Sequence, residues 1–175
     1  IGLALDSFME QIENWQVVSA MLIVYGIAFI VVEKLNKKTN VSTIDDMSYK
    51  TALLIGLFQV LSIIPGTSRS GATILGAMLV GCKREVAAEF SFFLAIPVML
   101  GASILKGAKA ILIDHISMTS TEVIVLIVGT LTAFAVSLVA VKFLMSFVKN
   151  HSFEVFGWYR IAIGAILIVY ALIKY

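Results

Sequence analysis

The chain alternates between long apolar stretches and short polar segments. Nearly uncharged runs cover residues 17–33, 85–105, 122–148 and 154–174, and Lys, Arg or Glu residues lie at or near their ends. About 20 consecutive apolar residues are enough for a helix to cross the hydrocarbon core of a bilayer. The pattern therefore predicts four ordinary membrane-spanning helices.

The apolar stretch over residues 50–81 differs from the others because Pro65 and Gly66 interrupt it. Each side of the break is only about 20 to 24 Å long at 1.5 Å per helical residue, whereas the hydrocarbon core is about 30 Å thick. The two half-helices therefore form either one broken span or a re-entrant hairpin. The polar residues 36–48 before this stretch predict an exposed loop.

The distribution of positive charge distinguishes the two arrangements, since Lys and Arg collect on the cytoplasmic face of membrane proteins. A hairpin places eight cations on one face and three on the other, and a straight crossing places seven against four. The eight are Lys34, Lys37, Lys38, Lys50, Lys83, Arg84, Lys142 and Lys149, and the three are Lys106, Lys109 and Lys174. The count favours the hairpin, with the eight-charge face in the cytoplasm and the Pro65 turn at membrane depth.

Composition supports a membrane protein and excludes several other classes. Hydrophobic residues make up 60% of the 175 residues and charged residues 14%, against about 25% charged in a soluble domain. The net charge of +2 gives no basis for nucleic-acid binding. Cys82 is the single cysteine, which excludes an internal disulfide and a multi-cysteine metal site. We predict an all-α, polytopic membrane helix bundle with a re-entrant helical hairpin, encoded by a fragment whose upstream residues are missing.

The break is the candidate functional site, because irregular backbone at membrane depth is tolerated only where protein buries it or where it lines a cavity. Glycines there allow a ligand to approach the backbone. A helix beginning near Ser68 points its positive end at the same turn, where an anion fits. The hydroxyl residues are Thr67, Ser68, Ser70 and Thr73, and the glycines are Gly66 and Gly71.

Arg69 makes the prediction of an anion site more specific. An arginine at the bilayer centre costs at least about 2.5 to 3.5 kcal/mol without a partner, and its planar fork matches two phosphate oxygens. Alternatively, Arg69 pairs with a buried carboxylate or with carbonyls, or lies at the membrane interface. The alternative for the Ser and Thr hydroxyls is a structural role, since these side chains often donate hydrogen bonds to carbonyls of their own helix. Their clustering around Arg69 and a Pro-Gly break favours a phosphate site.

These residues resemble a known family, the undecaprenyl-diphosphate phosphatases, which are the bacitracin-resistance proteins of bacterial membranes. The resemblance covers the whole chain, and the PGxSRSGxT run is its most specific part. The matching segments are Phe58-Gln59, residues 65–73, Asp45 to Tyr49, Glu89 to Pro97, and Tyr159-Arg160.

The resemblance implies hydrolysis of a polyprenyl diphosphate to the monophosphate, which recycles the lipid carrier for cell-wall synthesis at the bacterial inner membrane. It implies two inverted repeats, each with a re-entrant hairpin, of which this chain holds the second. Ser68, Arg69 and Thr73 would then be catalytic and contact the diphosphate, with Gly66, Thr67, Ser70 and Gly71 around it. It also implies a divalent cation, Mg²⁺ or Ca²⁺, for which this chain offers no assigned ligand, and it leaves a homodimer open.

The chain departs from the family pattern at one important point. The family's first signature, a glutamate-rich segment followed by Ser-Ser-Thr-Gly-His, is absent here. The equivalent repeat position before the break is Gln59, which cannot act as a base. We therefore expect a missing N-terminal half or a second chain to complete the site.

Other polar residues are weaker candidates. Glu89 could reach Arg69 or hold a metal, but it could equally be a carboxylate in the first turns of a helix. His115 and His151 lie between spans and are interpreted as surface residues. Arg160 is interpreted as an arginine that extends toward the membrane interface, and a role in the site is its unsupported alternative. Broken helices also occur in transporters, so a lipid-carrier transporter or flippase is the alternative function. Lipid regulation without catalysis is a third.

Overall fold

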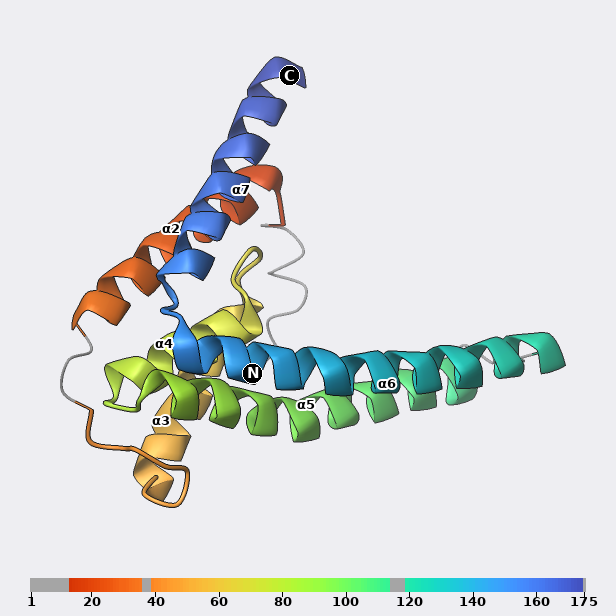
Figure 1. The fold of residues 1–175 in the computed structure, drawn as a ribbon. Coiled ribbons are helices and arrows are strands. Elements are labelled where there is room, and N and C mark those ends of the chain that lie inside the picture. Colours follow the sequence, from red (N-terminus) through yellow and green to blue (C-terminus); the bar gives the residue numbers. More distant parts are fainter. Residues whose placement is uncertain (1–12, 36–38, 114–118, 175) are drawn as a thin grey trace. The chain divides into compact units, whose positions relative to one another are not determined.

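The computed structural model describes residues 13–35, 39–113 and 119–174, and these are almost entirely helical (Figure 1). No strand forms among them, so the predicted all-α class is confirmed. The elements are α2 (Trp15–Leu35), α3 (Tyr49–Val60), the 3-10 helix η1 (Leu61–Ile63), α4 (Arg69–Leu79), α5 (Arg84–Leu112), α6 (Ser120–Asn150) and α7 (Glu154–Lys174).

Four of the described helices are long and apolar enough to cross a membrane, namely α2, α5, α6 and α7. Each of the four apolar runs expected from the sequence lies inside one of them. The chain is therefore a multi-pass membrane protein.

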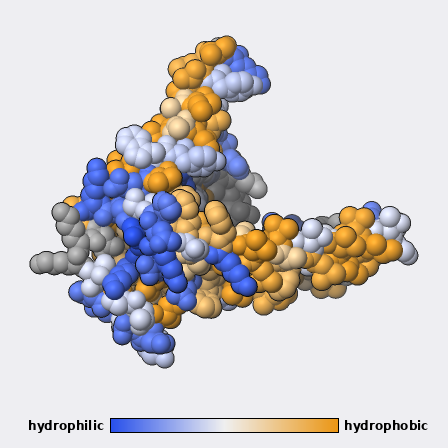
Figure 2. Space-filling view, viewed as in Figure 1, coloured by the Kyte–Doolittle hydropathy of each residue, from blue (hydrophilic) through white to orange (hydrophobic). Residues whose placement is uncertain are grey.

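The described residues form two compact units. One contains the chain up to Ser91 and again from Val148, and the other contains residues Phe92–Phe147. In the second unit the middle of α6 has no buried residue, and its apolar side chains form a continuous hydrophobic surface (Figure 2). Exposing such a surface to water is unfavourable, whereas the lipid of a bilayer solvates it.

In the first unit, α2 and α7 approach each other closely through glycines. A Cβ atom on Gly26 would lie 2.6 Å from Cγ1 of Ile161, and one on Gly157 would lie 2.7 Å from the Gly26 carbonyl oxygen. Small residues of this kind allow spanning helices to pack backbone to backbone. This contact fixes α7 beside α2 and thereby positions the side chains that α7 directs toward the break.

The two half-helices fold back on each other, which is the arrangement that the charge distribution favoured. Gly76 of α4 lies directly against the ring of Phe58 in α3, where a Cβ atom would clash. Helix α3 begins at the cap Ser48, whose side chain accepts a hydrogen bond from the Thr51 amide at 3.1 Å. The turn between α3 and α4 therefore lies at one end of a helical hairpin.

The loop before α3 is exposed as predicted over most of its described part, with one exception. Val41 is 7% exposed because its backbone pairs with the turn after α4: its amide donates to the Gly81 carbonyl at 3.2 Å, and its carbonyl accepts from the Lys83 amide at 3.0 Å. Gly81 has a φ of +95°, which favours glycine. The pairing anchors the loop to the end of the hairpin opposite the break.

Candidate phosphate site at the break between α3 and α4

The backbone changes direction at Gly66, which has a φ of +83°. Thr67 closes the turn by donating its amide to the Ile64 carbonyl at 3.0 Å. A Cβ atom on Gly66 would lie 2.6 Å from the carbonyl oxygen of Val18. Helix α2 therefore occupies the space on the Cβ side of Gly66, and contact between Gly66 and a ligand stays a prediction. Glycine is needed here for the turn and for the approach of α2.

Helix α4 starts beside Ser68, where the sequence predicted the beginning of a helix. Ser68 caps the helix, and its Oγ accepts a hydrogen bond from the Gly71 amide at 3.2 Å. The hydroxyls of Ser68 and Ser70 lie 3.1 Å apart. The amides and dipole of the first turn favour an anion beside these two hydroxyls.

Arg69 is the first residue of α4, and its side chain is held from α3. Its Nε donates to Oε1 of Gln59 at 3.4 Å. The neutral amide of Gln59 thereby orients the guanidinium. The structure thus brings Gln59, Ser68, Arg69 and Ser70 together at the turn.

Thr73 points elsewhere. Its hydroxyl is buried, lies 3.1 Å from the carbonyls of both Arg69 and Ser70, and forms a 2.5 Å hydrogen bond with Oγ of Ser91. This is the alternative in which a helix threonine bonds back to the preceding turn. In this structure Thr73 ties α4 to α5, and its contact with a phosphate stays a prediction.

The remaining acidic and histidine candidates do not join the turn. Glu89 has an exposed side chain on α5, and His151 is exposed after α6, while His115 lies outside the described residues. The described part of the chain contains no group of three or more His, Cys, Asp or Glu residues able to hold a metal ion. The donors at the turn are hydroxyls, amides and guanidiniums, and these do not fit Mg²⁺ or Ca²⁺, which prefer carboxylates.

Arg160, which the sequence interpretation placed at the membrane interface with a site role as the unsupported alternative, comes to the break from α7. Its Nη2 donates to the Gly66 carbonyl at 2.9 Å, and its guanidinium carbon lies 5.6 Å from the centre of the Tyr25 ring. Its Nη1 lies 3.5 Å from where a Cβ on Gly71 would be. The interpretation of Arg160 as an interfacial residue is therefore wrong. The cost of a guanidinium within an apolar span was the available signal.

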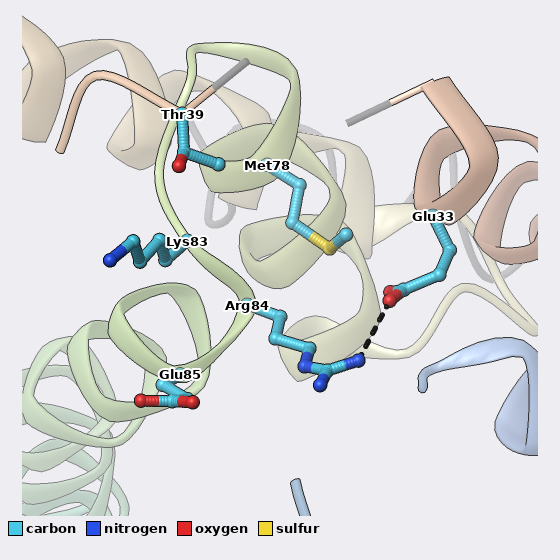
Figure 3. Close-up of a pocket in the computed structure, with 6 residues that line it drawn as sticks. All are labelled: Glu33, Thr39, Met78, Lys83, Arg84 and Glu85. Carbon is cyan, nitrogen blue, oxygen red and sulfur yellow. Dashed lines mark hydrogen bonds and ion pairs between the residues drawn. The ribbon is translucent and has the colours of Figure 1, made fainter. Parts of the chain in front are cut away.

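A separate cavity of about 360 Å³ lies at the other end of α4 (Figure 3). Arg84 points into it and donates to Glu33 at 3.1 Å, while the second oxygen of Glu33 accepts from the Phe153 amide at 3.4 Å. Its lining residues are Glu33, Thr39, Met78, Lys83, Arg84 and Glu85. Acids and bases balance there, so this cavity lacks the positive character of the break.

Together these features define a class: a multi-pass membrane protein with a broken helical hairpin and a cationic, hydroxyl-rich turn. The chain belongs to the family described as Bacitracin resistance protein BacA, whose model matches residues 1–166.

Curated relatives agree with this assignment. The chain is 55% identical over 173 residues to a protein of Enterococcus faecalis, covering 97% of this chain and 62% of the relative. It is 51% identical to one of Acetivibrio thermocellus, covering 98% and 63%, and 54% identical to one of Streptococcus suis, covering 100% and 64%. All three are called undecaprenyl-diphosphatase. The chain thus spans less than two thirds of their length.

Proposed function

We propose that this chain is part of an undecaprenyl-diphosphatase, which hydrolyses the lipid diphosphate to undecaprenyl phosphate and inorganic phosphate. The observation that carries the proposal is the start of α4, where Ser68, Arg69 and Ser70 surround helix amides in a turn of a membrane hairpin. The family and the names of the relatives point to the same substrate. This activity recycles the lipid carrier for cell-wall synthesis and confers resistance to bacitracin.

The proposed reaction transfers the terminal phosphoryl group to water. A water oxygen bonds to the terminal phosphorus, the anhydride P–O bond breaks, and its electron pair leaves with the prenyl monophosphate. Negative charge is spread over the phosphoryl oxygens in the transition state, so fixed positive charge there is effective. Arg69 and the first-turn amides of α4 supply that charge, and the Ser68 and Ser70 hydroxyls orient the oxygens. Thr67 and Thr73 are retained as predicted contacts.

The proton from the attacking water needs an acceptor, and Gln59 cannot serve because its amide is not basic. We assign this role to residues of the protein that lie outside the described part of this chain, in an upstream half or in the second copy of a homodimer. The proposal includes no step through a divalent cation, because the donors at the turn do not suit one.

The proposed location is the bacterial inner membrane. The face that carries eight of the cations lies in the cytoplasm, and the break opens toward the opposite side. The prenyl tail stays in the bilayer while the diphosphate enters the turn. Apolar side chains exposed on the described spans are compatible with a lipid substrate that arrives laterally.

A lipid-carrier transporter or flippase is the second candidate, because broken helices at membrane depth also build transport sites. Proteoliposomes containing the full-length protein and a long-chain prenyl diphosphate separate the two. The expected result is stoichiometric release of inorganic phosphate with appearance of the monophosphate. Movement of intact diphosphate between leaflets without phosphate release would overturn the proposal in favour of transport.

A further inference from the structure

Arg160 binds the break through a backbone carbonyl, which does not compensate the charge of its guanidinium. Its Nη2 donates to the carbonyl oxygen of Gly66 at 2.9 Å. A carbonyl satisfies a donor but carries no net charge. Among the described residues a salt bridge joins Arg84 with Glu33, and none involves Arg160. A second guanidinium charge is therefore present at the turn, together with that of Arg69.

The position of Arg160 also couples the last span to the start of α4. Its Nη1 lies 3.5 Å from the point where Gly71 would carry a Cβ atom. Gly71 provides the first-turn amide that donates to Ser68. That 3.5 Å separation is an ordinary van der Waals contact, so the guanidinium of Arg160 lies directly against the first turn of α4.

A buried polar atom beside this contact indicates that the guanidinium has hydrogen-bonding capacity left over. In the part of the chain that the structure describes, Nε of Arg160 is buried and has no hydrogen-bond partner. Buried donors without partners are uncommon in native proteins and call for an explanation such as a role at a site. This donor belongs to the same side chain that bonds to the Gly66 carbonyl at 2.9 Å.

We infer that Arg160 is a positioning residue of the phosphate site, which holds the Gly66 carbonyl and adds a second positive charge behind the first turn of α4. This inference rests on the proposed function. Arg160 acts through the backbone of the break, and the substrate meets the start of α4 that Arg160 keeps in place. The last span, α7, is thereby part of the site, although Arg160 lies 94 residues from Gly66 in the sequence.

The test measures phosphate release from a prenyl diphosphate by the full-length protein, with kcat and KM determined separately. Arg160→Met keeps an unbranched stem about as long as the aliphatic part of the arginine but removes its charge and its hydrogen bond. Loss of a hydrogen bond from a charged group changes an equilibrium by about 10-fold or more. We expect kcat to fall at least about 10-fold with a smaller change in KM, and Arg160→Lys to recover part of the loss. A kcat within twofold of the parent, or a rise in KM alone, would overturn the inference.

Two control variants on α7 separate positioning from general stability. Ile161→Ala removes packing next to Gly26 without touching the break, and Lys174→Ala removes a cation that lies 5.8 Å from the Tyr170 ring. Both should retain the parent kcat. If Ile161→Ala lowers kcat as much as Arg160→Met does at an equal loss of thermal stability, Arg160 has only a structural role and the inference fails.

Hydrogen–deuterium exchange distinguishes failure of the inference from failure of the proposed function. Amides of residues 64–72 should exchange faster in Arg160→Met than in the parent, and at the parent rate in Ile161→Ala. A parent protein that releases no phosphate refutes the proposed function, and the exchange measurement still decides whether Arg160 holds the break. Unchanged exchange in Arg160→Met would show that it does not.

Discussion

Replacing Gly66 with alanine tests the geometry of the break most severely. The residue has a φ of +83°, and an L-residue in the left-handed region costs roughly 1 to 2 kcal/mol. The new Cβ would also lie 2.6 Å from the Val18 carbonyl oxygen and 2.7 Å from its Cα. These are backbone atoms that cannot move aside as a flexible side chain can, and overpacking of this kind costs about 1 to 3 kcal/mol.

The two contributions to the Gly66→Ala change add to about 2 to 5 kcal/mol. For a chain of this size each kcal/mol lowers Tm by about 2 to 4 °C, so we expect a decrease of at least about 4 °C. The assay is thermal unfolding of the full-length protein in detergent. Phosphate release should fall as well, because the Gly66 carbonyl that Arg160 binds is displaced.

Gly56→Ala is the matched control. Gly56 lies in the middle of α3, and a Cβ there would meet no atom within 4 Å. Alanine in a helix interior is more favourable than glycine by up to about 1 kcal/mol, so the control should be neutral or stabilising. Equal Tm values for Gly66→Ala and the parent protein, or equal losses for the two variants, would show that the backbone at Gly66 does not need glycine.

Three further outcomes are expected. Thr73→Val should lower stability by about 1 to 3 kcal/mol, because it leaves the Ser91 hydroxyl without its buried partner; thermal unfolding measures this, and a neutral result would contradict the contact. Burial raises the pKa of the Cys82 thiol, so less thiolate is present at a given pH and alkylation near pH 8.5 should be slower in the folded than in the unfolded protein; equal rates would contradict its burial. Glu33→Gln should lower the free energy of unfolding by about 0.5 to 1.5 kcal/mol, because it weakens the ion pair with Arg84. This loss of stability should be smaller in high salt. A loss that does not depend on salt would contradict the ion pair as its cause.

The helices and the break could be predicted from the sequence because both are local properties. Apolar runs of spanning length define α2, α5, α6 and α7, and Pro65-Gly66 interrupts a helix wherever it occurs. The start of α4 followed from the same local pattern, since Ser68 is a favoured capping residue.

The contacts around the break could not be predicted in the same way because they join distant segments. Nothing local to Gly66 shows that Val18 packs against it, and nothing near Thr73 indicates its bond to Ser91. Arg160 is the instructive case. The energetic argument that identified Arg69 applies equally to a guanidinium in the last span, but its partner is a backbone carbonyl, which leaves no trace in the sequence.

In the proposed reaction the start of α4 binds and stabilises the transferring phosphoryl group through Arg69. The most direct test is phosphate release from a prenyl diphosphate by the full-length protein and its Arg69→Ala variant, with Lys109→Ala as a control cation away from the turn. Removing a group that stabilises developing charge typically costs at least about 100-fold in kcat. We therefore predict a loss of that size for Arg69→Ala and none for Lys109→Ala. Phosphate release by Arg69→Ala at the parent rate would contradict the account.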